Sequence, residues 1–274
     1  MKLLRRLSRR NALKTGLASI TTATIAAPSA HAVISPKAPG ETKIVAILGH
    51  DAMHNGVAYE TYIRSILRRK KNWRLIFCRS NKYFTPELIS DADLLMTQLF
   101  GGPYVDHIEG ITDRPEARKP LWNDELVEAV VDNVRNRGMG WMALHNSIWF
   151  GKKELEELMG TKPVLHQEIQ PLIFKDFNQE HPITRGMDDF FINLDEQFNV
   201  ELMSPSTTTV LFRTLAVHDK NDAVGGWCRE QGKGRVVGLL PGHEHWCYRV
   251  PEYQKIFWRA AHWAMGREIE PFNK

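Results

Sequence analysis

Apolar runs and segments of helical periodicity alternate along the first half of the chain. Residues 43–49 read Lys-Ile-Val-Ala-Ile-Leu-Gly, a β-branched run that is typical of a strand buried on both faces of a parallel sheet. In residues 59–67 the apolar side chains recur every three to four positions, which predicts an amphipathic helix. Residues 73–78, 93–100 and 140–144 predict further strands. This alternation predicts a doubly wound α/β fold, in which ligands bind beyond the carboxyl ends of the strands.

Two further helices are expected in this half. One is strongly periodic over residues 126–134, with Asn123 as its N-cap and Gly138 closing it. The other follows a sharp turn at residues 145–147 and runs near residues 152–159.

The remaining segments are less regular. A polar stretch over residues 101–119 is long enough to be a lid or an insertion. The second half favours short strands with hairpin-like turns, of which residues 231–234 are the clearest. A last helix is expected from about residue 252 to 265, with Pro251 in its first turn. The strands expected in this half cover residues 172–174, 198–202, 207–215, 224–228 and 235–240.

The N-terminus has the pattern of a twin-arginine export signal. Ser8 to Lys14 read Ser-Arg-Arg-Asn-Ala-Leu-Lys, an uncharged and weakly apolar run follows, and Ala30-His31-Ala32 supplies a small-x-small cleavage site. The apolar run is too short to cross a bilayer. The alternative is a basic helix on a membrane surface. We expect a twin-arginine signal peptide over residues 1–32 and a mature protein in the periplasm or secreted from the cell.

Removing this signal changes the charge of the chain. Six basic and no acidic residues leave with it, so the remaining 242 residues carry 30 basic and 32 acidic residues, a net charge of −2. A chain this close to neutral, without a basic stripe, gives no reason to expect nucleic acid as a partner. We expect no membrane contact after removal of the signal, a flexible lead over residues 33–42 and one domain over residues 43–274. A homo-oligomer stays open.

Covalent nucleophilic catalysis is disfavoured. The turn after the fourth strand reads Ala-Leu-His145-Asn146-Ser147, with neither thiol nor hydroxyl at its central position. The three cysteines, Cys78, Cys228 and Cys247, lack C-x-x-C spacing, so at most one disulfide can form. The pair to test is Cys228 with Cys247.

Histidines follow three of the expected strands. His50, His145 and His243 stand directly after or close to a strand end, and neighbouring strand ends lie about 5 Å apart. Asp195 and Glu196 lie among apolar neighbours, and a carboxylate beside imidazoles can orient them, act as a base or complete a metal site. A hydrogen-bonded interior residue remains the alternative for each histidine, and a loop salt bridge for the carboxylates.

A metal is compatible with the sequence without being indicated by a motif. His50 and His54 are four residues apart but lie in a loop, and no His-Glu-x-x-His or cysteine cluster is present. The cofactor is therefore unknown, a divalent metal is an open option, and zinc is the first to test. Aromatic side chains that could stack on a sugar are Tyr104, Trp149, Trp227, Trp246 and Tyr248.

Several segments have a familiar order and spacing, namely Gly49-His50-Asp51 and residues 143–146, 178–187, 194–197 and 226–243. Together they resemble the ThuA-like (trehalose utilisation) family along nearly the whole mature chain. The resemblance implies a flavodoxin-like, class I glutamine amidotransferase-like fold, a mainly parallel sheet with helices on both faces, without the Cys-His-Glu triad. His145 stands near the place of the missing cysteine, and His166 corresponds to a Gly-His-Pro element of the family, here Leu-His-Gln.

The resemblance also implies a role in carbohydrate metabolism, alongside oxidoreductases that generate 3-keto glycosides. We therefore expect an enzyme that acts on a 3-keto sugar or glycoside by His/carboxylate acid-base chemistry, with or without a metal, as a hydrolase, lyase or isomerase rather than a glutaminase. The alternative is a non-catalytic carbohydrate-binding or scaffold protein. The expected roles are proton transfer by His145 and Glu196, substrate binding by His166, Arg185, Asp195 and Trp227, and metal binding by His50 and His243.

Overall fold

The computed structural model describes residues 35–49, 54–78, 83–99 and 121–272. All of them belong to the second of two units, Ile34–Lys274. The first unit, Met1–Val33, with the expected signal peptide, lies outside the described residues, as do His50, Tyr104 and the expected lid over residues 101–119. No helix among the described residues is long and apolar enough to span a membrane.

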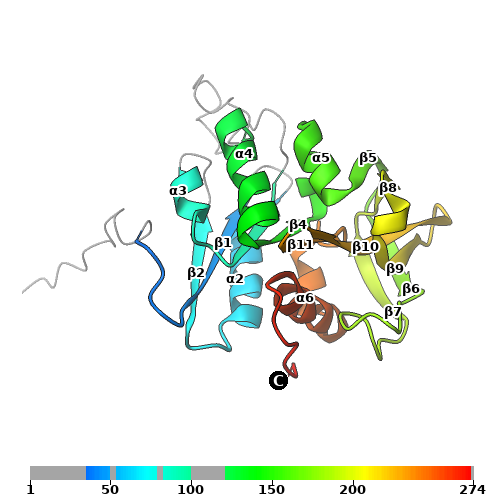
Figure 1. Ribbon diagram of the computed structural model, residues 1–274. Coiled ribbons are helices and arrows are strands. Elements are labelled where there is room, and N and C mark those ends of the chain that lie inside the picture. The colour runs from blue at the N-terminus through cyan, green and yellow to red at the C-terminus, as the bar shows by residue number, and fades with distance from the viewer. Residues whose placement is uncertain (1–34, 50–53, 79–82, 100–120, 273–274) are drawn as a thin grey trace, which may run out of the picture. The chain divides into compact units, whose positions relative to one another are not determined.

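A nine-stranded sheet forms the centre of the described unit (Figure 1). Its strands are β1 Thr42–Leu48, β2 Trp73–Cys78, β3 Leu94–Gln98, β4 Gly140–Leu144, β6 Gln170–Lys175, β7 Phe190–Asp195, β9 Thr209–Ala216, β10 Asn221–Gln231 and β11 Gly234–Leu239. They are ordered β2-β1-β3-β4-β11-β10-β9-β6-β7. A separate antiparallel pair, β5 (Thr161–His166) and β8 (Phe198–Leu202), lies beside it.

The sheet has a parallel half and an antiparallel half. The pairs from β2 to β11 are all parallel, and their order is that of a flavodoxin-like sheet, with β11 as the fifth strand. The pairs from β11 to β7 are all antiparallel. The expected α/β class is confirmed, and the parallel half contains the strand ends on which the site predictions depend.

Helices cover both faces of the parallel half. The helices α2 (Gly56–Leu67) and α6 (Pro251–Ala264) lie against one face (Figure 1). The helices α3 (Pro86–Ile89), α4 (Asp124–Asp132) and α5 (Lys153–Met159) form the other layer. Short helical turns over residues 133–137, 145–148, 205–207 and 245–249 connect these elements.

Strand β1 is apolar from Ile44 to Leu48 because both of its faces are covered. Alternate side chains of a strand point to opposite faces. Ile44, Ala46 and Leu48 therefore join the core cluster that includes residues of α2 and α6, while Val45 and Ile47, also fully buried, face the other layer. Polar alternation could not appear in a strand with this environment.

Local signals placed the helix ends correctly. The Asn123 side chain accepts a hydrogen bond from the Leu126 N–H at 2.8 Å, as an N-cap does. Gly138 has φ +94°, a left-handed conformation that glycine adopts without strain, and it ends the turn that follows α4. Gly140 permits close packing, since a Cβ there would lie 2.5 Å from the Ala264 carbonyl oxygen of α6.

Two strands have no counterpart among the expected elements. β5 contains Pro163 and is exposed along most of its length. β7 is the edge strand of the sheet, and Phe191 and Leu194 are exposed on it. Neither strand has the buried apolar run or the regular alternation from which strands are predicted.

Candidate active site

Two strand ends bring His145 and His243 together. β4 and β11 are adjacent and parallel, with Leu144 opposite Leu239, so the residues after them leave the sheet side by side. His145 opens a helical turn with φ +46°, an uncommon value for a residue with a side chain. This sharp turn directs its ring toward the segment after β11, residues 240–244, here called the histidine loop.

The histidine loop is held by buried hydrogen bonds to its main chain. Asp195 accepts hydrogen bonds from the N–H groups of Gly242 at 2.8 Å, His243 at 2.9 Å and Glu244 at 3.2 Å. The main-chain carbonyl groups of the loop accept hydrogen bonds from three buried side chains. Tyr59 donates to His243, Gln98 to Gly242 and Tyr253 to Pro241. The position of His243 is therefore determined by the fold before any ligand binds.

The antiparallel half must curl to make these contacts. β7 stands four strands away from β11, which in a flat sheet would separate them by about 19 Å. Asp195 at the end of β7 nevertheless bonds directly to the loop that follows β11. The curl brings the next residue, Glu196, to the carboxyl edge of the parallel strands.

Glu196 joins three imidazoles. Its Oε2 lies 3.1 Å from Nδ1 of His243 and 3.3 Å from Nε2 of His145. Its Oε1 lies 2.8 Å from Nδ1 of His166, at the end of β5. His145 is fully buried and Glu196 nearly so, whereas the side chain of His166 is 56% exposed. One edge of this group thus faces solvent.

The tautomer of His145 follows from its second ring nitrogen. Nδ1 of His145 lies 3.0 Å from the carbonyl oxygen of Leu240, which can only accept a hydrogen bond. Nδ1 must therefore carry a proton, and in the neutral ring Nε2 presents a lone pair toward Glu196 and His243.

Burial and charge shift the pKa values of this group in different directions. Burial lowers the pKa of His145 to about 4, despite its contact with Glu196. Burial would raise the pKa of Glu196, but its contacts with His145 and His243 outweigh this effect and hold the pKa far below its usual range. Burial would lower the pKa of His243, but the Glu196 carboxylate outweighs it and raises the pKa. The site thus combines a neutral imidazole, a carboxylate and an imidazole that readily accepts a proton.

His54 completes what we call the histidine cluster, defined as His54, His145, His243 and Glu196. Its ring centroid lies 5.4 Å from that of His145 and 4.8 Å from that of His243. One ring nitrogen from each of the three histidines lies within 4.8 Å of the others, close enough for them to hold a metal ion. In the sequence, His54 was marked only by its spacing from His50. Its position beside the other two histidines depends on where α2 begins, two residues later.

Asp195 anchors the loop rather than facing a substrate. It is fully buried, and burial raises its pKa to about 6 against the hydrogen bonds that it accepts from Glu196, Glu244 and Gly242. Its oxygens are occupied by these main-chain groups, so the structure gives it a positioning role for His243.

Two of the expected substrate-binding residues are not brought to the cluster. Trp227 is fully buried in β10, where its indole N–H donates to the Met159 carbonyl at 3.1 Å and its ring packs on Gly238. Arg185 donates to the Glu180 carbonyl, and its own carbonyl accepts from Arg259 of α6. These contacts lie away from the carboxyl ends of the strands. The sequence could not show this, because a local motif carries no information about distances in the fold.

The other aromatic candidates differ in exposure. Trp246 is 49% exposed, and its ring contacts that of His245 in a tilted arrangement with centroids 4.4 Å apart. Tyr248 is fully buried and donates to Gln98 at 3.1 Å. Trp246, three residues after His243, is therefore the exposed aromatic ring nearest in sequence to the cluster.

All three cysteines are free and buried, so the pairing of Cys228 with Cys247 is not formed. Burial raises the pKa of Cys78 to about 11 and that of Cys228 to about 12, and it raises the pKa of Cys247 well above its usual value. Such thiols are poor nucleophiles.

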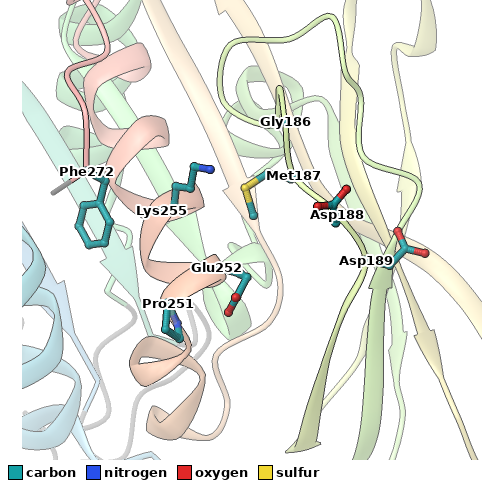
Figure 2. A pocket seen from close by; sticks show the side chains of 8 residues that line it. All are labelled: Gly186, Met187, Asp188, Asp189, Pro251, Glu252, Lys255 and Phe272. Carbon is teal, nitrogen blue, oxygen red and sulfur yellow. The ribbon is translucent and has the colours of Figure 1, made fainter. Parts of the chain in front are cut away.

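A groove of about 360 Å³ lies beside α6 (Figure 2). α6 supplies one side of it, and residues 186–189 supply the opposite side. No residue of the histidine cluster lines this groove, so the two features are separate. Its lining residues are Gly186, Met187, Asp188, Asp189, Pro251, Glu252, Lys255 and Phe272.

Comparison with known proteins identifies relatives of this architecture. The ThuA family, described as trehalose utilisation, matches residues 48–264. No curated protein matches the chain. A ThuA-like protein from Parabacteroides merdae superimposes with a TM-score of 0.65 at 13% identity, over 84% of this chain and 92% of its own. A ThuA-like protein from Bacteroides uniformis gives 0.62 at 14% identity, over 84% and 93%.

A larger enzyme contains a similar unit. A β-galactosidase from Bacillus circulans sp. alkalophilus superimposes with a TM-score of 0.54 at 10% identity, over 83% of this chain and 32% of the galactosidase. At such identities these likenesses show a shared fold.

Proposed function

We propose, because the chain belongs to the ThuA family of trehalose utilisation, that it is an enzyme of carbohydrate metabolism acting on a keto sugar or keto glycoside. The family supports a carbohydrate-related role. The finer statement, acid-base chemistry at a carbon next to a carbonyl, is our proposal. One observation carries it: the Glu196 carboxylate contacts His145, His166 and His243 at the carboxyl edge of the parallel strands.

This group can move a proton in both directions. A ketone at C3 of a sugar acidifies the neighbouring C–H bond. The lone pair on His145 or the carboxylate of Glu196 removes this proton, and the electron pair of the C–H bond moves into the carbonyl to form an enolate. His243, whose pKa is raised, stabilises the enolate oxygen with a hydrogen bond from its protonated ring.

The enolate has two productive outcomes. Return of the proton to a different carbon or face isomerises the sugar. Alternatively, the electron pair expels the glycosidic substituent at C1, which breaks the glycosidic bond and leaves an unsaturated keto sugar. His166, half-exposed on Oε1 of Glu196, is placed to protonate the departing oxygen.

Glutaminase chemistry is not supported. The residue at the turn after β4 is His145, and the buried cysteines have raised pKa values. From the sequence of residues 1–32 we further propose that the protein acts in the periplasm, after export by the twin-arginine route.

The test is turnover of a panel of 3-keto glycosides by the mature protein, followed by NMR in D₂O. We expect deuterium to enter beside the carbonyl, and the rate to fall by about 10²–10⁴ in Glu196→Gln and His145→Gln. His218→Gln, on the exposed turn between β9 and β10, is the matched control. Unchanged turnover in both site variants rejects the proposal, and binding without exchange supports a non-catalytic carbohydrate-binding protein instead.

A further inference from the structure

Three donor atoms of the histidine cluster form a nearly equilateral triangle. Nε2 of His145 lies 3.2 Å from Nδ1 of His243 and 3.3 Å from Oε2 of Glu196, and Nδ1 of His243 lies 3.1 Å from Oε2. Ligand atoms about 2.0–2.1 Å from a tetrahedral zinc ion are separated from one another by about 3.3 Å. A point about 2 Å from all three atoms therefore exists, just outside the plane of the triangle.

The three atoms of the triangle present more lone pairs than protons to one another. Because Nδ1 of His145 donates to Leu240, its Nε2 offers a lone pair, and this lone pair faces the oxygen of a carboxylate. Two acceptors at 3.3 Å repel each other. A proton on Nδ1 of His243 can point fully at only one of them, whereas a cation at the centre attracts all three donor atoms.

The contact with Leu240 is also what a ligating histidine requires. A histidine that binds a metal through one nitrogen normally donates its other N–H to a carbonyl or carboxylate, which fixes the tautomer and the ring orientation. His145 has this arrangement, and Asp195 fixes the main chain of His243 through its N–H.

We infer that Nε2 of His145, Nδ1 of His243 and Oε2 of Glu196 bind one divalent metal ion, with zinc the best match to two imidazoles and one carboxylate. Three protein ligands leave the fourth position to water or substrate, as in catalytic zinc sites. One ring nitrogen of His54 lies within 4.8 Å of ring nitrogens of His145 and His243, and the three-ligand site does not depend on it.

This inference deepens the proposed function, on which its catalytic meaning rests. A bound metal supplies a Lewis acid for the carbonyl oxygen. With a metal bound, Nε2 of His145, Nδ1 of His243 and Oε2 of Glu196 would hold the ion instead of moving protons, and His166, on the other oxygen of Glu196, would take over the proton transfer of the proposed reaction.

The experiment is metal titration of the mature protein. The protein is purified, stripped with a chelator and titrated with Zn²⁺ in a calorimeter. Co²⁺ is then used as a spectroscopic probe of the ligand geometry. We expect one ion per chain, and a loss of affinity of at least about 100-fold in His243→Gln and Glu196→Gln, beyond what changes outside the ligand sphere produce.

A control separates ligands from other histidines. His218→Gln, on the exposed turn between β9 and β10, is expected to keep one ion per chain, and circular dichroism shows whether each variant is folded. Absence of stoichiometric binding, or equal binding by folded His243→Gln and Glu196→Gln, overturns the metal site. Keto-glycoside turnover by the stripped protein would also overturn its catalytic role while sustaining the proposed reaction, whereas binding without turnover would sustain the site and reject the reaction.

Discussion

The Asp195 carboxylate positions the main chain of His243. Its Oδ1 accepts the His243 N–H at 2.9 Å in a fully buried position, and its Oδ2 accepts the Gly242 N–H at 2.8 Å. A carboxylate at the end of an edge strand thus determines where an imidazole after a central strand lies. This relationship links the stability of the histidine loop to the geometry of the site.

Replacing Asp195 by Asn is expected to destabilise the protein by about 2–3 kcal/mol. The amide removes a charged acceptor and places an NH₂ group against main-chain N–H donors, and hydrogen bonds to charged groups contribute about 1.5–3 kcal/mol. Urea unfolding measures the change in free energy. Asp188→Asn, exposed in the groove beside α6, is the control and should change little. Equal stability of the two variants would contradict an anchoring role for Asp195.

Trp227 is expected to matter for folding and not for sugar binding. Phenylalanine at this position loses the hydrogen bond to Met159 and part of the packing on Gly238, so we expect a lower melting temperature with an unchanged KM. Thermal unfolding and steady-state kinetics on the same preparation separate the two. A raised KM with unchanged stability would restore the role in substrate binding expected from the sequence.

Trp246 is expected to show the opposite behaviour. Its ring is half-exposed, so Trp246→Ala should change stability by only about 0.5 kcal/mol, as for most surface substitutions. If its ring stacks on a sugar, KM rises and kcat changes little. A KM equal to that of the unaltered protein would remove Trp246 from the binding surface.

His262 is expected to make the fold acid-sensitive. Its ring is buried against Trp73 and Trp258, its Nδ1–H donates to the Trp258 carbonyl, and burial lowers its pKa below the ordinary 6.5. The unfolded chain therefore binds more protons than the folded chain just below pH 6.5. Stability is full above this pH and falls as the pH decreases toward the folded pKa, by at most about 1.4 kcal/mol per pH unit.

The measurement is urea unfolding between pH 7.5 and 5, compared between the protein, His262→Gln and the exposed control His218→Gln. The slope of stability against pH should be shallower in His262→Gln alone. An identical slope in all three would assign the acid sensitivity to other groups.

Export is expected to depend on the arginine pair near the N-terminus. Changing Arg9 and Arg10 to Lys keeps the charge but removes the paired guanidinium groups that the twin-arginine signal contains. We expect the precursor to accumulate in the cytoplasm, measured by fractionation and immunoblotting. Normal appearance of a shortened protein in the periplasm would point to another export route.

The parallel half of the sheet could be predicted because its strands are short, continuous apolar runs. The expected strands at residues 73–78 and 140–144 coincide with β2 and β4. β5 and β7 could not be found in this way, because they are partly exposed and lack a regular pattern. β5 pairs with β8 outside the main sheet and β7 pairs with β6 at one of its edges, and both pairings are properties of the tertiary fold.

The site was predictable in part for the same reason. His145 and His243 follow buried strands, so the rule for the carboxyl edge of a parallel sheet places them together. Glu196 could be proposed only from its apolar neighbours in sequence, since its contact with the histidines depends on the curl of the antiparallel half of the sheet. Trp227 was expected near the site because its ring could stack on a sugar, and Arg185 because it stands in a segment typical of the family. Aromatic rings and family segments also serve packing alone.

The origin of the cluster in two halves of the sheet has a consequence for folding. His145 and His243 become neighbours when the parallel strands pair, but Glu196 reaches them only after the chain has closed contacts across long sequence separations, which form slowly. Any molecule that binds there adds its binding energy to the folded state. Protection from proteolysis should therefore report occupancy, even before the chemistry of the occupant is known.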